Sequence, residues 1–198
     1  MQQGEEFDIP SWEQIYAMLL DLGVKIRKDK FKPDIIVGVS RGGWTPARIL
    51  SDLLENPDIA NVKAEFYLGV AETKKEPIIT QSVSVNVNNE RVLVVDDVSD
   101  TGRSLHLVKS HLLEEGARDL KIATLYYKPW SITKPDYYEK TTRDWIIFPW
   151  ERKEVFRKVV EKFRQNGKTV EDAKRTLVKY GFDSKLAERF AREVSEGS

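Results

Sequence analysis

Cysteine is absent from the 198 residues, which excludes disulfides, thiolate metal ligands and nucleophilic thiol chemistry. Histidine and methionine are scarce, with two of each. No apolar run approaches the roughly 18 residues that indicate a membrane-spanning helix. The first residues, "MQQGEEFDIPSW", lack the basic start and apolar centre of a signal peptide. We therefore expect a cytoplasmic protein without a membrane partner.

An excess of charge of one sign is also missing. The chain has 32 Lys and Arg against 32 Asp and Glu, although charged residues make up 32% of it. Proteins that bind nucleic acid through its phosphates usually carry a clustered positive charge. The balance of signs predicts that this protein has no nucleic-acid partner.

Apolar runs and helical periodicity alternate along the first 150 residues. We expect strands at 34–40, 62–70, 78–87, 91–97, 120–128 and 144–150, and helices at 11–30, 41–56 and 101–117, the first with Ser11 as N-cap. Apolar strands alternating with helices indicate an α/β fold, with a parallel twisted sheet covered by helices on both faces.

The composition changes after Trp150. Three segments with apolar residues at helical spacing follow, and Thr169 with Asp172 forms a capping-box pattern before the second of them. We predict one domain over 1–151 and a small all-α C-terminal extension over 152–198. Short isolated helices are marginal in water, so the extension is expected to pack on the rest of the chain or on a neighbouring subunit.

The segment "VLVVDDVSDTG" (92–102) places three acids directly after a buried strand. Ligands of open α/β sheets bind at the carboxyl ends of the strands. Ser40–Gly43, Asp96–Gly102 and Lys128 all follow expected strands, so the fold predicts that they converge on one edge of the sheet.

The residues from Asp96 to Ser104 are of the kinds that bind a sugar phosphate. The loop after Asp97 leads into a helix, and the amide groups at a helix N-terminus bind phosphate well. Thr101 and Ser104 add hydroxyl donors. The neighbouring carboxylates of Asp96 and Asp97 accept hydrogen bonds from two sugar hydroxyls or hold Mg²⁺. The segment therefore has the parts for a ribose 5-phosphate.

"VLVVDDVSDTG" resembles the phosphoribosyl-pyrophosphate signature of the type I phosphoribosyltransferases. "VGVSRGGWTPARIL" (37–50) resembles the pyrophosphate loop of that family. "LYYKPW" and "DWIIFPW" look like the purine-binding end of the 6-oxopurine enzymes, particularly the xanthine-guanine enzymes and their archaeal relatives. The resemblance covers roughly residues 10–151, so 1–151 is interpreted as the phosphoribosyltransferase domain.

The resemblance implies a reaction in which a purine base and phosphoribosyl pyrophosphate give a nucleoside monophosphate and pyrophosphate, with Mg²⁺. Asp100 would be the general base at the purine N7, and Asp97 the metal contact. The Ser40–Arg41 peptide would be cis. The residues implied in phosphoribosyl-pyrophosphate binding are Arg41, Gly42, Gly43, Asp96, Asp97, Asp100, Thr101, Gly102, Arg103 and Ser104. Those implied in purine binding are Lys128, Trp145 and Ile146.

Each motif has a simpler interpretation. Asp96 and Asp97 are also compatible with a solvated strand end, and "SRGG" with an ordinary turn. Lys128 would then be a surface lysine, and Trp145 a core aromatic. Two motifs at family spacing favour the functional interpretation. Lys74 and Lys75, in a polar loop over 71–77, are expected to be solvated, with closure over pyrophosphate as the alternative that the resemblance implies. The two histidines receive no role.

The sequence does not decide which purine base is the substrate. An ammonium donor such as Lys128 suits the carbonyl of hypoxanthine, guanine or xanthine, and suits the amine of adenine poorly. Backbone carbonyls near Trp145 would still accept from a base amine, so an adenine enzyme is the alternative. A transcriptional regulator that senses phosphoribosyl pyrophosphate is a further alternative. The family implies a homodimer or homotetramer.

Overall fold

The computed structural model describes residues 6–67 and 76–196. These residues form two compact units. The first unit runs from Ile15 to Arg143, and the second joins the described residues up to Gln14 with those from Asp144 onward. The boundary predicted at residue 151 falls inside the second unit, and the division into a catalytic domain and an extension stays a prediction.

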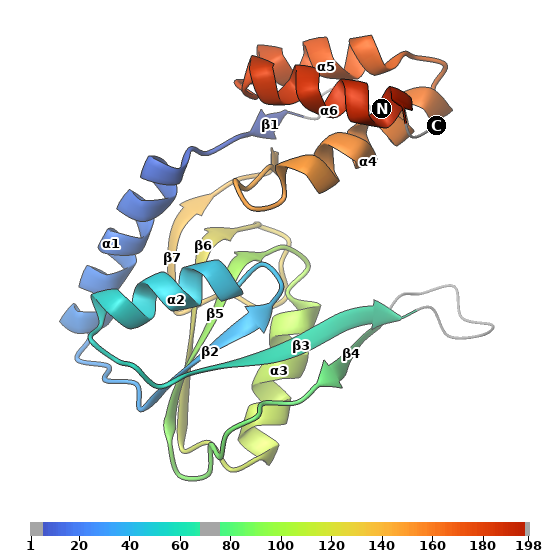
Figure 1. Ribbon diagram of the computed structural model, residues 1–198. Helices are drawn as coiled ribbons and strands as arrows, with labels where there is room; N and C mark the ends of the chain where they lie inside the picture. The colour runs from blue at the N-terminus through green and yellow to red at the C-terminus, as the bar shows by residue number, and fades with distance from the viewer. Residues whose placement is uncertain (1–5, 68–75, 197–198) are drawn as a thin grey trace. The chain divides into compact units, whose positions relative to one another are not determined.

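The first unit contains a six-stranded sheet (Figure 1). Its strands are β2 (Ile35–Ser40), β3 (Ile59–Tyr67), β4 (Glu76–Gln81), β5 (Arg91–Ser99), β6 (Asp119–Tyr127) and β7 (Tyr137–Thr141), in the order β4-β3-β2-β5-β6-β7. All neighbouring strands are parallel except β3 and β4, which are antiparallel. The predicted parallel sheet is confirmed, with one antiparallel strand at its edge.

Different helices cover the two faces of this sheet. The helices are α1 (Trp12–Lys28), α2 (Trp44–Leu53) and α3 (Arg103–Glu114). On one face Leu105, Val108 and Leu112 of α3 are buried against alternate residues of the strands, which include Val37 and Val94. Successive strand residues point to opposite faces. Gly38, next to Val37, faces α2, where a methyl group added to it would lie 3.0 Å from Cβ of Ala47.

Several predicted strands differ in extent, and two short strands were missed. The strand predicted over 62–70 is observed as Ile59–Tyr67, and residues 68–70 lie outside the described residues. The strand predicted over 78–87 is observed as Glu76–Gln81, the segment that pairs with β3. The strand predicted over 144–150 is reduced to β8 (Trp145–Ile146), which lies outside the main sheet. Strand β7, "YYEKT", and β1 (Phe7–Asp8) have no run of apolar residues that would have indicated them.

The second unit is mainly helical. It contains β1 paired in parallel with β8, and the helices α4 (Arg152–Gln165), α5 (Val170–Lys179) and α6 (Ser184–Glu196). The three predicted helices are thus confirmed, as is the capping box of Thr169 and Asp172. Ser11 is the expected cap, since its Oγ accepts from the backbone N–H of Gln14 at 3.2 Å.

The apolar faces of these three helices meet one another. The buried cluster that they form consists of Ile147, Val155, Phe156, Val159, Val160, Phe163, Ala173, Leu177, Phe182, Ala187 and Ala191, with Phe7, Ile9 and Trp145 packed against it. The helices therefore share their core with the first strand of the chain and with the segment at 145–147.

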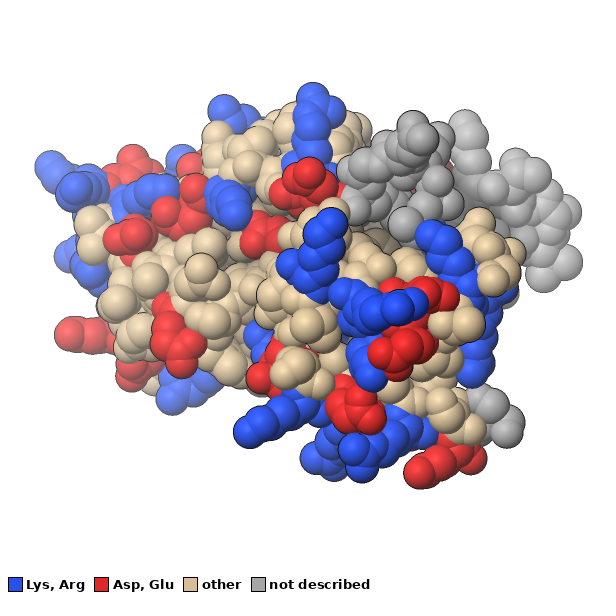
Figure 2. All heavy atoms as spheres, turned by 90° about the horizontal axis from the view of Figure 1, so that it is seen from above, with Lys and Arg blue, Asp and Glu red and all other residues tan. Residues whose placement is uncertain are grey.

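Charged side chains of both signs are interleaved over the face of the molecule seen in Figure 2. On the helices of the second unit, Lys174 pairs with Glu188 at 2.7 Å and Arg192 with Glu188 at 3.3 Å. Such alternation gives no continuous basic surface over α5 and α6. No helix in the described part of the chain is long and apolar enough to cross a membrane.

Asp34 connects the start of β2 to β5. Its carboxylate accepts from the backbone N–H of Arg91 at 2.8 Å and from the guanidinium of Arg91 at 2.9 and 2.6 Å. Arg118 lies 3.7 Å away. The hydrogen bonds from Arg91 hold the pKa of Asp34 well below its usual range. The ionised carboxylate is therefore favoured in the folded protein.

We expect Asp34→Asn to lower the free energy of unfolding by about 1 kcal/mol at pH 7, since a charged hydrogen bond is lost at a partly exposed site. The folded pKa is depressed, so the contribution of Asp34 is complete above its ordinary pKa of about 3.9 and is lost as the pH falls below it. Urea unfolding at pH 7 and pH 3 measures both effects. Asp52→Asn, at an exposed position of α2, is the control. A difference between wild type and variant that does not shrink at pH 3 would contradict this account.

Candidate active site

Three separate segments meet at the carboxyl edge of the sheet in the first unit. Strand β5 pairs with β2 on one side and with β6 on the other, both in parallel. Ser40–Gly43 follows β2, Asp96–Gly102 covers the end of β5, and Lys128 follows β6. The convergence predicted from the sequence is confirmed.

The glycine turn after β2 lies directly against the acids of β5. A methyl group added to Gly42 would overlap the carboxylate of Asp97, and one added to Gly43 would overlap the backbone at Val95 and Asp96. Position 43 therefore requires glycine for the close approach of the two segments, whereas a side chain at position 42 would displace the carboxylate of Asp97. The Ser40–Arg41 peptide is cis, as the resemblance implied.

Asp96 and Asp97 form a closely spaced pair of carboxyl groups. The backbone N–H of Asp97 donates to Oδ1 of Asp96 at 2.9 Å. Burial disfavours the charge of Asp96 and the neighbouring Asp97 repels it, so the pKa of Asp96 is raised well above its usual range. A cation or hydroxyl donors placed at this pair would relieve the repulsion.

The loop after the acids opens into a small pocket at the start of α3. The pocket has a volume of about 240 Å³ and is lined by Phe66, Asp96, Asp97, Val98, Ser99, Asp100, Thr101, Gly102, Ser104 and Leu105. Gly102, with φ of 76°, is the N-cap residue and has no side chain to cap the helix, while the N–H of Arg103 donates to Thr101 Oγ1 at 3.4 Å. The N–H groups at the start of a helix are the groups that bind an anion. The predicted residues from Asp96 to Ser104, Arg103 excepted, lie together around this pocket.

The loop is joined to the segment that follows β6. Ser99 Oγ donates to the carbonyl of Thr133 at 2.7 Å, and Thr133 Oγ1 donates to the carbonyl of Gly102 at 2.8 Å. Ser131 Oγ lies 2.8 Å from Ser99 Oγ. Sequence reasoning missed these three hydroxyl residues, because serine and threonine in a loop are ordinary solvent-exposed residues unless the tertiary structure brings them together.

Lys128 is buried, with 6% of its surface exposed, and is therefore not the surface lysine of the simpler interpretation. Its Nζ lies 5.5 Å from the centroid of the Trp130 ring. The indole N–H of Trp130 donates to Oδ1 of Asp100 at 3.1 Å. Lys128 and Asp100, which were predicted on separate grounds, are thus connected through a tryptophan to which the sequence analysis gave no role.

The two arginines of the predicted set lie beside acids. Arg103 pairs with Glu76 at 3.0 Å, and both side chains are largely exposed. Lys63 and Thr80 lower the pKa of Glu65 by hydrogen bonds, and the charge of Arg41 contributes to the same shift. Residues 71–75 of the predicted polar loop, Lys74 and Lys75 included, lie outside the described residues.

Trp145 and Ile146 belong to the second unit. Strand β8, which they form, pairs with Phe7 and Asp8 of β1. The ring of Trp145 lies 5.9 Å from that of Phe7, and Nζ of Lys162 lies 5.7 Å from the Trp145 ring. Trp145 is partly buried against the helical core, and its predicted contact with a purine stays a prediction.

The described residues do not by themselves form a complete metal site. Among residues 6–67 and 76–196, no group of three or more His, Asp or Glu side chains is placed to hold a metal ion. Mg²⁺ commonly binds through one or two carboxylates and completes its shell with substrate phosphates and water. The pair Asp96 and Asp97 fits that mode of binding.

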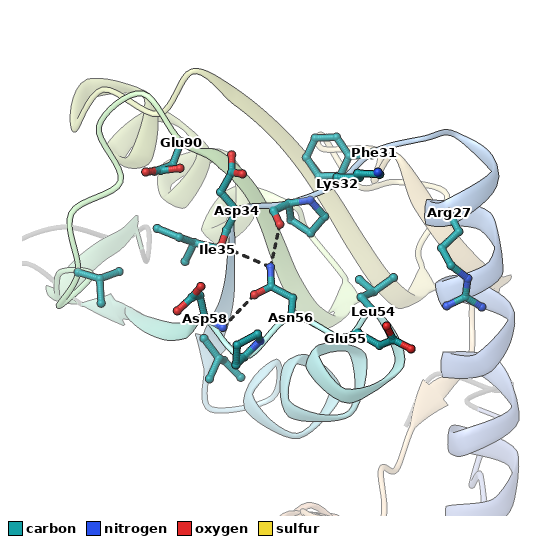
Figure 3. Close-up of a pocket in the computed structure, with 14 residues that line it drawn as sticks. Arg27, Phe31, Lys32, Asp34, Ile35, Leu54, Glu55, Asn56, Asp58 and Glu90 are labelled. Atoms are coloured by element: carbon teal, nitrogen blue, oxygen red, sulfur yellow. Dashed lines mark hydrogen bonds between the residues drawn. The ribbon is translucent and has the colours of Figure 1, made fainter.

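A second hollow, of about 800 Å³, lies at the other end of the strands. Figure 3 shows Asn56 within it, whose amide donates to the carbonyl of Asp34 at 3.4 Å and accepts from the backbone N–H of Asp58 at 2.8 Å. The hollow is lined by the starts of β2 and β3, at Ile35 and Ile59. Since ligands of such sheets bind at the carboxyl ends, the smaller pocket is the candidate active site.

An acidic strand end that runs into a helix N-terminus, at the carboxyl edge of a parallel sheet, is typical of proteins that bind a phosphorylated sugar or nucleotide. The chain belongs to the phosphoribosyl transferase domain family, whose family model matches residues 9–157. The resemblance stated from the motifs is confirmed.

Two relatives are enzymes of purine metabolism by name. The xanthine-guanine phosphoribosyltransferase of Gluconobacter oxydans is 30% identical over 150 residues, covering 74% of this chain and 85% of that enzyme. The crystal structure of a purine phosphoribosyltransferase from Pyrococcus horikoshii is 38% identical, with a TM-score of 0.67, and covers 73% of this chain and 93% of that one. The chain is thus a member of a family of transferases.

One solved structure also matches the helical part. A hypothetical protein from Neisseria gonorrhoeae, solved with bound ppGpp, has a TM-score of 0.69 and covers 97% of this chain and 99% of that one. At 22% identity the similarity shows the fold alone. The combination of the α/β unit with the C-terminal helices therefore occurs in another protein.

Proposed function

We propose that this protein transfers the 5-phosphoribosyl group of phosphoribosyl pyrophosphate to N9 of a 6-oxopurine. The observation that carries the proposal is the pocket between Asp96 and Leu105, in which paired carboxyl groups lie beside a helix N-terminus whose N-cap residue is glycine. This arrangement binds both ends of a ribose 5-phosphate. The names of the relatives support a purine as the acceptor.

The residues act on different parts of the substrate. The amides at the start of α3, with the hydroxyls of Thr101 and Ser104, hold the 5-phosphate, and Asp96 and Asp97 accept hydrogen bonds from the ribose hydroxyls. The backbone at Arg41–Gly43 binds the departing pyrophosphate. Asp100 takes the proton from N7 of the purine, which makes N9 a better nucleophile toward C1 of the sugar.

Mg²⁺ is the cofactor that we propose, with Asp97 as its protein contact. When bound, it neutralises the charge that develops on pyrophosphate as the bond to C1 breaks. The pair Asp96 and Asp97 keeps the ion and the ribose at one place. The homodimer or homotetramer implied by the resemblance, and the cytoplasmic location, stay predictions.

Lys128 is the residue proposed to select the base. Its ammonium group donates hydrogen bonds and accepts none, so it matches a carbonyl at position 6 of the purine. The ring of Trp145 is proposed to stack on the purine, and backbone carbonyls near Trp145 and Ile146 are proposed to accept from an exocyclic amine of the base. A panel of hypoxanthine, guanine, xanthine and adenine, each with phosphoribosyl pyrophosphate and Mg²⁺, tests the proposal. A preference for adenine would contradict the assignment of a 6-oxopurine as the acceptor. Tight binding of phosphoribosyl pyrophosphate without turnover of any base would favour a regulator.

We expect Lys128→Met to lower kcat/KM for 6-oxopurines about 10- to 100-fold, since a charged hydrogen bond to the substrate is lost while the length of the side chain is kept. Steady-state kinetics with each base measure this, and the values for adenine should change little. Lys109→Met, at an exposed position of α3, is the control. An equal loss for all four bases would mean that Lys128 is structural.

A further inference from the structure

Trp130 lies between the two groups that are proposed to act on the purine. Its indole N–H donates to Oδ1 of Asp100 at 3.1 Å. Its ring lies within cation–π distance of two cations, with Lys128 Nζ at 5.5 Å and the Arg143 guanidinium at 5.9 Å from the centroid. Neither the Asp-Asp loop signature nor the glycine turn had indicated that Trp130 contacts these groups.

The backbone fixes Trp130 relative to the phosphate loop. The N–H of Ser131 donates to the carbonyl of Lys128 at 3.0 Å, which closes a turn around Trp130. The N–H of Ile132 donates to the carbonyl of Thr101 at 3.0 Å. The tryptophan is therefore held on a segment that is bonded to the loop carrying Asp100.

Asp100 needs such a partner. Its side chain is exposed, and χ2 of an aspartate has only broad preferences, so packing and rotamer preference alone would not fix the carboxylate. A general base must present one oxygen to the proton that it removes, within hydrogen-bond distance. Because an indole N–H donates and does not accept, its bond to Oδ1 fixes the carboxylate without competing for the proton. Oδ2 is left for the purine N7.

We propose that Trp130 is a positioning residue, which orients the carboxylate of Asp100 toward N7 of the base. This inference rests on the proposed function, because it requires Asp100 to act on a purine. Trp130 touches no reacting atom in this account and acts through Asp100 alone. The contacts of its ring with Lys128 and Arg143 keep the indole from turning away.

The variant Trp130→Phe tests this, since it removes the N–H and keeps an aromatic ring for the two cations. We expect the single-turnover rate of nucleotide formation to fall about tenfold, the effect of one charged hydrogen bond. The KM for phosphoribosyl pyrophosphate should stay within about twofold, because Trp130→Phe leaves in place the amides and hydroxyls that are proposed to hold the 5-phosphate. Trp12→Phe is the matched control, since Trp12 is 49% and Trp130 48% exposed.

A double variant separates positioning from a structural role. In the Asp100→Ala background, the further change Trp130→Phe should alter the rate by less than about twofold, because the group on which it acts is gone. A tenfold loss in both backgrounds, or no loss in the single variant, would overturn the inference. If the wild-type protein forms no nucleotide from any purine base, the proposed function itself fails, and that outcome is distinct from these.

Discussion

We expect Asp100→Asn to slow nucleotide formation about 10²- to 10⁴-fold, which is the usual effect of removing a general base. Asparagine has nearly the same shape, and its amide oxygen still accepts from the indole of Trp130. The exposed position of Asp100 means that no buried contact is lost. The melting temperature should therefore stay within about 2 °C of the wild-type value. Single-turnover kinetics with a saturating 6-oxopurine measure the chemical step.

Asp21→Asn, at an exposed position of α1, provides the control for loss of one negative charge. It should leave the rate unchanged. If Asp100→Asn turned over at a rate near that of the wild type, another group would have to remove the proton, and the role of Trp130 would have no basis.

Phe156→Ala should destabilise the helical unit by about 3–5 kcal/mol, the usual cost of removing a fully buried phenylalanine side chain. Phe156 is 0% exposed, and its ring lies 6.0 Å from that of Phe182 and 5.9 Å from that of Phe190. These rings come from α4, from the segment before α6, and from α6, so the cavity would open at the centre of the second unit. Thermal unfolding followed by circular dichroism measures the loss.

Val178→Ala tests whether the effect depends on burial, since Val178 is 37% exposed on α5. It should cost less than about 1 kcal/mol. The activity of Phe156→Ala is measured well below the melting temperature of that variant. If residues 152–198 have no part in the chemistry, Phe156→Ala should form nucleotide at the wild-type rate. A folded variant with abolished chemistry would give the helices a role at the active site.

The sequence by itself determined the main elements of the α/β unit and the centre of its site. Strands such as Val92–Val95 are continuously apolar because both faces are buried, and this pattern needs no knowledge of partners. The acids at 96, 97 and 100, with Gly102 after them, have a fixed order because one local turn between a strand and a helix positions them all. The same applies to Thr169 and Asp172, whose mutual hydrogen bonds lie within one turn.

Only the tertiary structure decided which distant residues meet. The partners Ser99, Ser131 and Thr133, and the bond between Trp130 and Asp100, join segments about 30 residues apart, and no local preference encodes such pairs. The helices after residue 151 were predicted one by one, but not that they share a core with Phe7 and Ile147. An apolar stripe predicts that one face of a helix is buried. It does not predict which residues pack against that face, because hydrophobic burial is not directional.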